Sequence, residues 1–230
     1  HVPLDHAGGV GTLLKQLPNA QILVHKKGAA HLVEPTKLWA ASKATLGFLA
    51  DLFGAPEPVA ADRITIASEG LQLDLGGGFK VRVLESSGHA AHNLAYFDEV
   101  NRGIFVGDAA GAYFEQYGSV YPTTPPPFRP DIALITLEKL ANLEPLFIYY
   151  SHFGTAGEGA LRLRRYAEQI RMWLTIVQDG VKRGDRDDVI RERIFALDDS
   201  VHPLVPILMA DSAHRKTLIE NSVQGFIQFA

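Results

Sequence analysis

Three side chains of types that commonly bind metal ions lie within the first six residues of the chain: His1, Asp5 and His6. Two glycines, Gly8 and Gly9, follow closely behind them. Imidazole and carboxylate groups at this spacing can converge on one ion, or on a pair of ions, from a single turn. A run of this kind also occurs among ordinary polar surface residues, so the rest of the chain has to decide between the two interpretations.

Further along the chain, three more residues of the same types follow apolar segments. His89 comes after Gly88, Asp108 after Gly107, and His152 after a serine. Each stands where an apolar run gives way to small or polar residues, which on an α/β scaffold is the usual place for functional groups. Together with the N-terminal group, these three residues make four positions in one chain, which favours a metal site over a chance cluster.

Taken in order, these residues resemble the signature of the metallo-β-lactamase fold hydrolases, which is His-x-His-x-Asp-His followed by a Gly-His, a Gly-Asp and a late His at strand ends. The resemblance covers about residues 1–154 and implies an α/β fold, the αβ/βα sandwich of that family. Members of the family place several strands before the first motif. Because the chain starts at His1, the resemblance also implies that those N-terminal strands are missing from this sequence.

The resemblance implies a ligand set for two metal ions. One ion is bound by His1 and His89, the other by Asp5, His6 and His152, and Asp108 bridges them. The chain departs from the family at Pro3, which stands where the second histidine belongs and has no side-chain ligand to offer. We therefore expect two zinc ions, or one, with iron or manganese as further candidates.

By the same resemblance, the chain is a metal-dependent hydrolase of an ester, thioester, lactone or amide bond in a small molecule. Asp5 or Asp108 is the expected catalytic residue, which positions a metal-activated water or accepts its proton.

One alternative is a mononuclear non-haem iron dioxygenase of the same fold, because His1, His89 and Asp108 form a two-histidine, one-carboxylate set. This alternative ranks second because the chain has no cysteine, and we associate a cysteine-containing segment with those enzymes. The other alternative is a degenerate, non-catalytic member that serves as a binding module.

Aromatic residues after Asp108 are candidates for a substrate pocket. Lactonases of this fold often place a tyrosine soon after the bridging aspartate, and Tyr113 lies five residues on, with Phe114 and Tyr117 close behind. His92 is not at a ligand position of the family, and it is a candidate for contacting substrate or for orienting a ligand. For these residues, ordinary packing roles are a competing interpretation.

Composition sets limits on the other functions. The chain has 230 residues, 47% of them hydrophobic, and a net charge of −4. This size suffices for a substantial core, and the absence of a basic cluster argues against nucleic acid or an anionic membrane as partner. We expect a metallo-β-lactamase-like domain over residues 1–157, a helical extension over 158–230, and a cytoplasmic location.

Apolar periodicity and turn residues predict the elements. Helices are expected over residues 8–17, 35–53, 131–143, 161–177, 187–197 and 214–229, and strands over 21–25, 63–67, 71–75, 79–84, 93–97, 103–106 and 146–150. The proline-rich stretch 122–130 is expected to be an extended loop. Since the last helix carries an apolar face, we expect it to dock on its own domain or on a second subunit, which makes a homodimer a further expectation.

Overall fold

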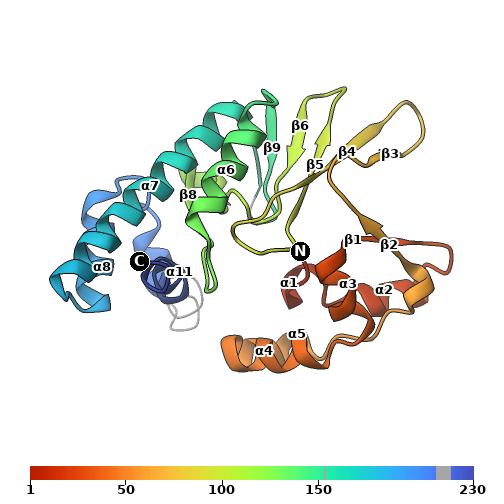
Figure 1. Cartoon of the computed structure of the whole chain (residues 1–230), viewed down its shortest axis with the longest axis horizontal. Coiled ribbons are helices and arrows are strands. Elements are labelled where there is room, and N and C mark those ends of the chain that lie inside the picture. The colour runs from red at the N-terminus through yellow and green to blue at the C-terminus, as the bar shows by residue number, and fades with distance from the viewer. Residues whose placement is uncertain (153, 211–218) are drawn as a thin grey trace. The chain divides into compact units, whose positions relative to one another are not determined.

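The computed structural model describes residues 1–152, 154–210 and 219–230 (Figure 1). These residues form two compact units, His1–Leu71 and Gln72–Ala230. Both units combine helices with strands, and the C-terminal region is helical, so the predicted α/β class with a helical extension is confirmed. The domain boundary expected between residues 157 and 158 stays a prediction.

The first unit is built on two parallel strands, β1 (Ile22–His25) and β2 (Ile64–Ala67). Its helices are α1 (Leu4–Ala7), α2 (Val10–Gln16), α3 (Lys26–Val33), α4 (Thr36–Leu46) and α5 (Phe48–Phe53), and the short 3-10 turn η1 (Ala61–Arg63) precedes β2. Small aliphatic side chains form its core: Val2, Leu14, Val24, Leu32 and Val59. Because Val2, the residue after His1, belongs to this core, the N-terminal motif is anchored to the packed interior of the first unit.

Two features of this unit differ from the sequence-based prediction. The single helix expected over residues 35–53 is divided at Gly47, whose φ of +54° lies in a region that glycine adopts without steric cost. Helix α3 was not predicted, because its sequence starts with two lysines and a glycine and it has only 8 residues. His25 is the N-cap residue of α3, and its Nδ1 atom accepts a hydrogen bond from the Lys27 amide at 3.1 Å.

The second unit contains a six-stranded sheet in the order β10-β9-β6-β5-β4-β3. Its strands are β3 (Gln72–Asp74), β4 (Lys80–Glu85), β5 (Leu94–Asp98), β6 (Gly103–Phe105), β9 (Phe147–Tyr149) and β10 (Thr155–Gly157). β6 and β9 are parallel and the other pairs are antiparallel. As a result, β4, β6 and β9 all run in the same direction, and their carboxyl ends meet one edge of the sheet.

Helices α6 (Pro130–Ala141) and α7 (Gly159–Arg183) pack against each other beside this sheet (Figure 1). One apolar cluster joins sheet residues such as Ile104 and Ile148 to Leu137 of α6 and Ile170 of α7. The same cluster continues into α8 (Asp187–Leu197), α9 (Val205–Ala210) and α11 (Asn221–Ile227), through Ile194, Leu208 and Phe226 respectively. The C-terminal helices therefore share the core of the sheet instead of forming a core of their own.

The segment after Asp108 is more regular than the sequence indicates. It forms an antiparallel hairpin of β7 (Ala112–Phe114) and β8 (Ser119–Tyr121), with the 3-10 turn η2 (Glu115–Tyr117) between them. The helix expected over residues 214–229 corresponds to α11, and residues 214–218 lie outside the described part of the chain. Across the described residues, no helix combines the length and the apolar character needed to cross a bilayer.

Candidate metal centre

His89, Asp108 and His152 gather at one edge of the six-stranded sheet because of the strand directions. His89 follows β4, Asp108 follows β6 and His152 follows β9, and the carboxyl ends of these three strands point the same way. The structure thus brings together three of the six residues that the sequence predicts as metal ligands, all within the second unit.

The carboxylate of Asp108 is flanked by the two imidazoles. Nε2 of His89 lies 3.7 Å from Oδ2, and Nε2 of His152 lies 3.4 Å from Oδ1. Ligand atoms bound tetrahedrally at about 2.0–2.2 Å from one ion lie roughly 3.3–3.6 Å from each other. The two distances are close to this edge length, and because each imidazole faces a different oxygen, the arrangement fits a carboxylate shared between two ions.

The other ring nitrogen of His89 is held by the main chain. Nδ1 lies 2.6 Å from the carbonyl oxygen of Thr123. A carbonyl oxygen can only accept a hydrogen bond, so in the neutral ring Nδ1 carries the proton and Nε2 keeps its lone pair. The contact therefore leaves the Nε2 atom, which faces Asp108, ready to act as a metal ligand.

Asn93 ties together the strand ends that carry His89 and Asp108. Its side-chain Nδ2 atom donates to Oγ of Ser86 at 2.6 Å and to the carbonyl oxygen of Val106 at 3.2 Å. Gly107 has a φ of +57°, and a Cβ built there would lie 2.6 Å from Oδ1 of Asn93. A glycine is thus required directly before Asp108, both by the backbone conformation and by this close approach.

The first unit contains the remaining predicted ligands on and beside a short helix. The Pro3 carbonyl accepts hydrogen bonds from the amides of His6 at 3.0 Å and Ala7 at 2.9 Å, and so begins α1. Asp5 and His6 therefore lie on a helical turn, and Pro3 has the backbone conformation of a residue that precedes a helix. Proline at this position therefore has a structural role as well as the effect of removing a ligand.

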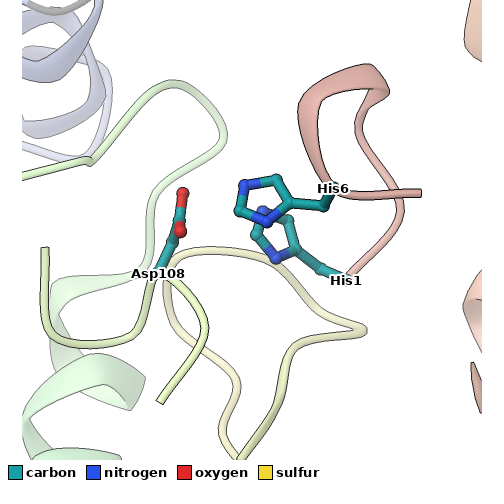
Figure 2. A group of neighbouring side chains, drawn as sticks. All are labelled: His1, His6 and Asp108. Carbon is teal, nitrogen blue, oxygen red and sulfur yellow. The ribbon is translucent and has the colours of Figure 1, made fainter. Parts of the chain in front are cut away.

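Within this cluster, the side chains are close to one another. Oδ2 of Asp5 lies 3.4 Å from Nε2 of His6, which is again the separation of two ligands on one tetrahedral ion. The rings of His1 and His6 lie side by side, with their centroids 4.0 Å apart (Figure 2). Each unit thus has its own group of residues of the types that bind zinc, iron or manganese.

Tyr166 of α7 lies close to Asp108 from the helical side. Burial raises the pKa of its hydroxyl group, and the negative charge of Asp108 raises it further, while a hydrogen bond from the Thr123 backbone acts in the opposite direction. The Tyr166 hydroxyl therefore remains protonated and uncharged throughout the physiological pH range. Tyr166 was not among the residues predicted from the sequence.

The candidate substrate contacts occupy different environments. Tyr113 is 4% exposed, and its ring stacks on Tyr150 with centroids 4.9 Å apart, beneath the guanidinium group of Arg162. Phe114 is half-buried at the end of β7, and Tyr117 is exposed in η2. His92 is half-buried, three residues after His89. A role in substrate binding stays a prediction for all four residues.

Besides Tyr166, sequence reasoning missed two residues that shape this centre. Asn93 is fully buried, and a polar residue at the start of an apolar strand is the signal that could have identified it. Thr123 acts on His89 through its carbonyl group, which every residue type has. Side-chain type carries no information about such a contact, so no sequence signal was available.

Comparison with known proteins places the chain among others of this architecture. The model of the metallo-beta-lactamase superfamily matches residues 1–152. A curated relative, the metallo-beta-lactamase fold-containing protein ST1585 of Sulfurisphaera tokodaii, is 30% identical over 158 residues. The match covers 67% of this chain and 58% of the relative, so this chain spans less than two thirds of that protein's length.

Solved structures with low sequence identity share the fold. The crystal structure of ST1585 from Sulfolobus tokodaii has a TM-score of 0.72 at 23% identity, covering 99% of this chain and 78% of that one. The metallo-beta-lactamase family protein TTHA1429 from Thermus thermophilus has a TM-score of 0.64 at 16% identity, with 98% and 71% coverage. The family model matched over residues 1–152 and the relative with 30% identity show that the chain belongs to the metallo-beta-lactamase superfamily.

Proposed function

We propose that this protein is a metal-dependent hydrolase that cleaves an ester, thioester, lactone or amide bond in a small-molecule substrate. The observation that carries the proposal is the geometry around Asp108, whose two oxygens face the Nε2 atoms of His89 and His152 at 3.7 and 3.4 Å. Superfamily membership supports the same class of reaction, because the family includes metal-dependent hydrolases.

The proposed ligand set follows the order of the family motif along the chain. It consists of His1, Asp5, His6, His89, Asp108 and His152, with Pro3 in place of one further histidine. The spacings within each unit support this set, since Asp5 and His6 show the same 3.4 Å separation as Asp108 and His152. Zinc is the metal we propose, in one or two copies. A zinc ion held by these residues would lower the pKa of a bound water to about 7 and polarise the substrate carbonyl.

The two carboxylates differ in what they are able to do during hydrolysis. Both oxygens of Asp108 face imidazole nitrogens, and its side chain is 6% exposed. The Asp5 side chain is 39% exposed, and a general base must be able to reach the proton that it accepts. We therefore assign the acceptance of the water proton to the Asp5 carboxylate, whereas Asp108 holds the ligand cluster together.

The substrate is proposed to contact His92, which lies close to His89 in the sequence, and the aromatic residues of β7 and the turn that follows it. Phe114 and Tyr117 offer aromatic surface, and His92 offers a hydrogen-bonding ring. For Tyr113, contact with substrate requires approach to a ring already covered by Tyr150 and Arg162.

The composition gives no basic patch for nucleic acid, and we propose a cytoplasmic protein, with a homodimer as the proposed assembly.

Metal analysis combined with activity assays tests this function. Protein purified without added metal is subjected to elemental analysis and assayed against ester, thioester, lactone and amide substrates, before and after chelation. One or two zinc-like ions and a chelator-sensitive hydrolysis are the expected results. A single iron with oxygen consumption would support the dioxygenase instead, and protein that neither contains nor binds metal would support the non-catalytic scaffold.

A further inference from the structure

Thr123 connects two candidate ligands through its own backbone and side chain. Its carbonyl oxygen lies 2.6 Å from Nδ1 of His89, and its hydroxyl group donates to the Asp108 carbonyl at 3.3 Å. The Thr123 side chain is buried, so water does not compete readily for these contacts. The position of this one residue therefore affects both the orientation of the His89 ring and the loop that carries Asp108.

The next residue, Thr124, is hydrogen-bonded to Ser222 of the C-terminal helix α11. Its hydroxyl group donates to the Ser222 carbonyl at 2.9 Å, and its amide donates to Oγ of Ser222 at 3.4 Å. A Cβ atom built on Gly225 would lie 1.7 Å from the Thr124 carbonyl oxygen. This approach is closer than any side chain permits, so α11 rests with its backbone directly on Thr124.

Helix α11 is in turn fixed in the core of the second unit. Phe226 is fully buried, and its ring packs against Phe128 and Trp173 with centroid separations of 4.9 and 5.7 Å. Ser222 and Val223 of the same helix are also buried. Because α11 has little freedom to shift, the residues that it contacts are held at a defined position.

We propose that α11 is a positioning element for the metal centre, which acts on His89 through Thr124 and Thr123. Ser222 and Gly225 hold Thr124, the adjoining peptide places the Thr123 carbonyl, and that carbonyl keeps the proton of His89 on Nδ1. Nε2 of His89 is then directed toward Asp108 as an unprotonated ligand. The inference rests on the proposed function in naming His89 as a metal ligand, but the chain of contacts lies wholly within the second unit.

Thr124→Val tests the inference, because it removes the hydroxyl group that binds Ser222 and keeps the shape of the side chain. Thr124→Ser, which keeps the hydroxyl group, is the matched conservative variant. Ile194→Val in α8 is the control for a general loss of stability, since Ile194 is fully buried in the same unit and its apolar side chain forms none of the hydrogen bonds in this series. The Ser222→Ala variant provides a second, milder change at the same junction.

Two measurements separate positioning from simple destabilisation. One is the zinc dissociation constant, measured by competition with a chelating dye, and the other is the ¹⁵N spectrum of the His89 ring in metal-free protein, assigned with the aid of His89→Gln. We expect Thr124→Val to weaken zinc binding about 10-fold, within the range reported for residues that orient a metal ligand. Its His89 ring should show a mixture of the two neutral tautomers, while Thr124→Ser and Ile194→Val keep the Nδ1–H form.

The inference is overturned if Thr124→Val and Ser222→Ala only lower the melting temperature, as Ile194→Val does, and leave both zinc affinity and the His89 spectrum unchanged. The ring spectrum is recorded without metal, so it also decides the matter if the wild-type protein binds no zinc. In that case the proposed function fails, and an altered His89 tautomer in Thr124→Val would still support the link from α11.

Discussion

Nε2 of His152 lies 3.4 Å from Oδ1 of Asp108, while the other oxygen of the same carboxylate faces His89. One buried side chain thus has a different imidazole beside each of its oxygens. Both separations exceed the roughly 2.7–2.9 Å of strong charge-assisted hydrogen bonds. They are close to the spacing of neighbouring ligand atoms around one metal ion, which supports the proposed metal site.

Asp108→Ala is expected to abolish hydrolysis and to lower the metal content of the purified protein. Asp108 is placed between two ligands, so its removal should weaken metal binding by at least about 10–100-fold, the loss typical of residues that only orient a ligand. The metal content is measured by elemental analysis of protein purified without added metal, and activity is measured in the same preparation.

His92→Ala is the matched comparison for Asp108→Ala. His92 is half-buried and lies three residues after His89, but it does not occupy a ligand position of the family motif. We expect the metal content of His92→Ala to equal that of the unmodified protein. Equal metal loss from the two substitutions would show that the ligand roles of Asp108 and His92 have been misassigned.

Pro3→His is expected to raise the metal stoichiometry toward two ions per chain. The substitution restores an imidazole at the position where the chain departs from the family. In the proposed ligand set, the ion assigned to His1 and His89 would gain a ligand, and the ion assigned to Asp5, His6 and His152 would not. In the unmodified protein, the proposed position of Asp5, His6 and His152 should therefore bind metal more tightly than that of His1 and His89. Titration followed by elemental analysis measures both quantities.

Pro3→Ala controls for the loss of the proline ring at the start of α1. Alanine removes the ring and keeps the carbonyl group that accepts from His6 and Ala7, without adding a ligand. Its metal content should match that of the unmodified protein. Two ions at full occupancy in the unmodified protein would contradict the idea that Pro3 weakens one position.

The strand ends could be predicted from the sequence because apolar runs stop there and residues of the metal-binding types begin. Residues 187–197 were likewise predicted correctly as a helix, now α8, since they have clear apolar periodicity and two aspartates in the first turn. The two strands of the β7–β8 hairpin were not predicted. Its strands have three residues each, too few for an alternating pattern to stand out.

The contacts that orient the candidate ligands could not be predicted in the same way. Thr123 acts through its carbonyl group, and Thr124 meets a helix almost a hundred residues further along the chain. Backbone contacts between such distant segments depend on packing, which local periodicity does not report. The apolar face of the last helix was recognised, and the structure shows that in α11 this face packs inside its own unit.

Phe226→Ala is expected to destabilise the protein by about 3–5 kcal/mol, the usual cost of removing a large aromatic side chain from a core. Phe226 is fully buried between Phe128 and Trp173, so the cavity left behind has rigid walls. Ile135→Ala, at a 69% exposed position of α6, should change stability by less than about 0.5 kcal/mol. Urea unfolding of both variants measures the difference, and equal midpoints would contradict the docking of α11.

Asp198 is the buried acceptor that joins α7 to the segment after α8. Its Oδ2 atom accepts from Nε1 of Trp173 at 2.7 Å and from Nε2 of Gln169 at 2.8 Å, and its Oδ1 atom accepts from the Ser200 amide at 3.0 Å. The residue itself is almost fully buried. All three donors would lose this acceptor if the carboxylate were removed.

Asp198→Ala should therefore lower the free energy of unfolding by about 1–3 kcal/mol, the cost of leaving one buried donor, Nε1 of Trp173, without its acceptor. Nε2 of Gln169 keeps the Val120 carbonyl oxygen and Oγ of Ser200 as acceptors. The neighbouring Asp199 provides the control, since its side chain is 96% exposed and Asp199→Ala should stay within about 0.5 kcal/mol of the unmodified protein. Urea unfolding followed by tryptophan fluorescence is the suitable measurement, because Trp173 reports directly on this contact. Similar unfolding midpoints for the two variants would show that the Asp198 hydrogen bonds contribute no more to stability than an exposed carboxylate does.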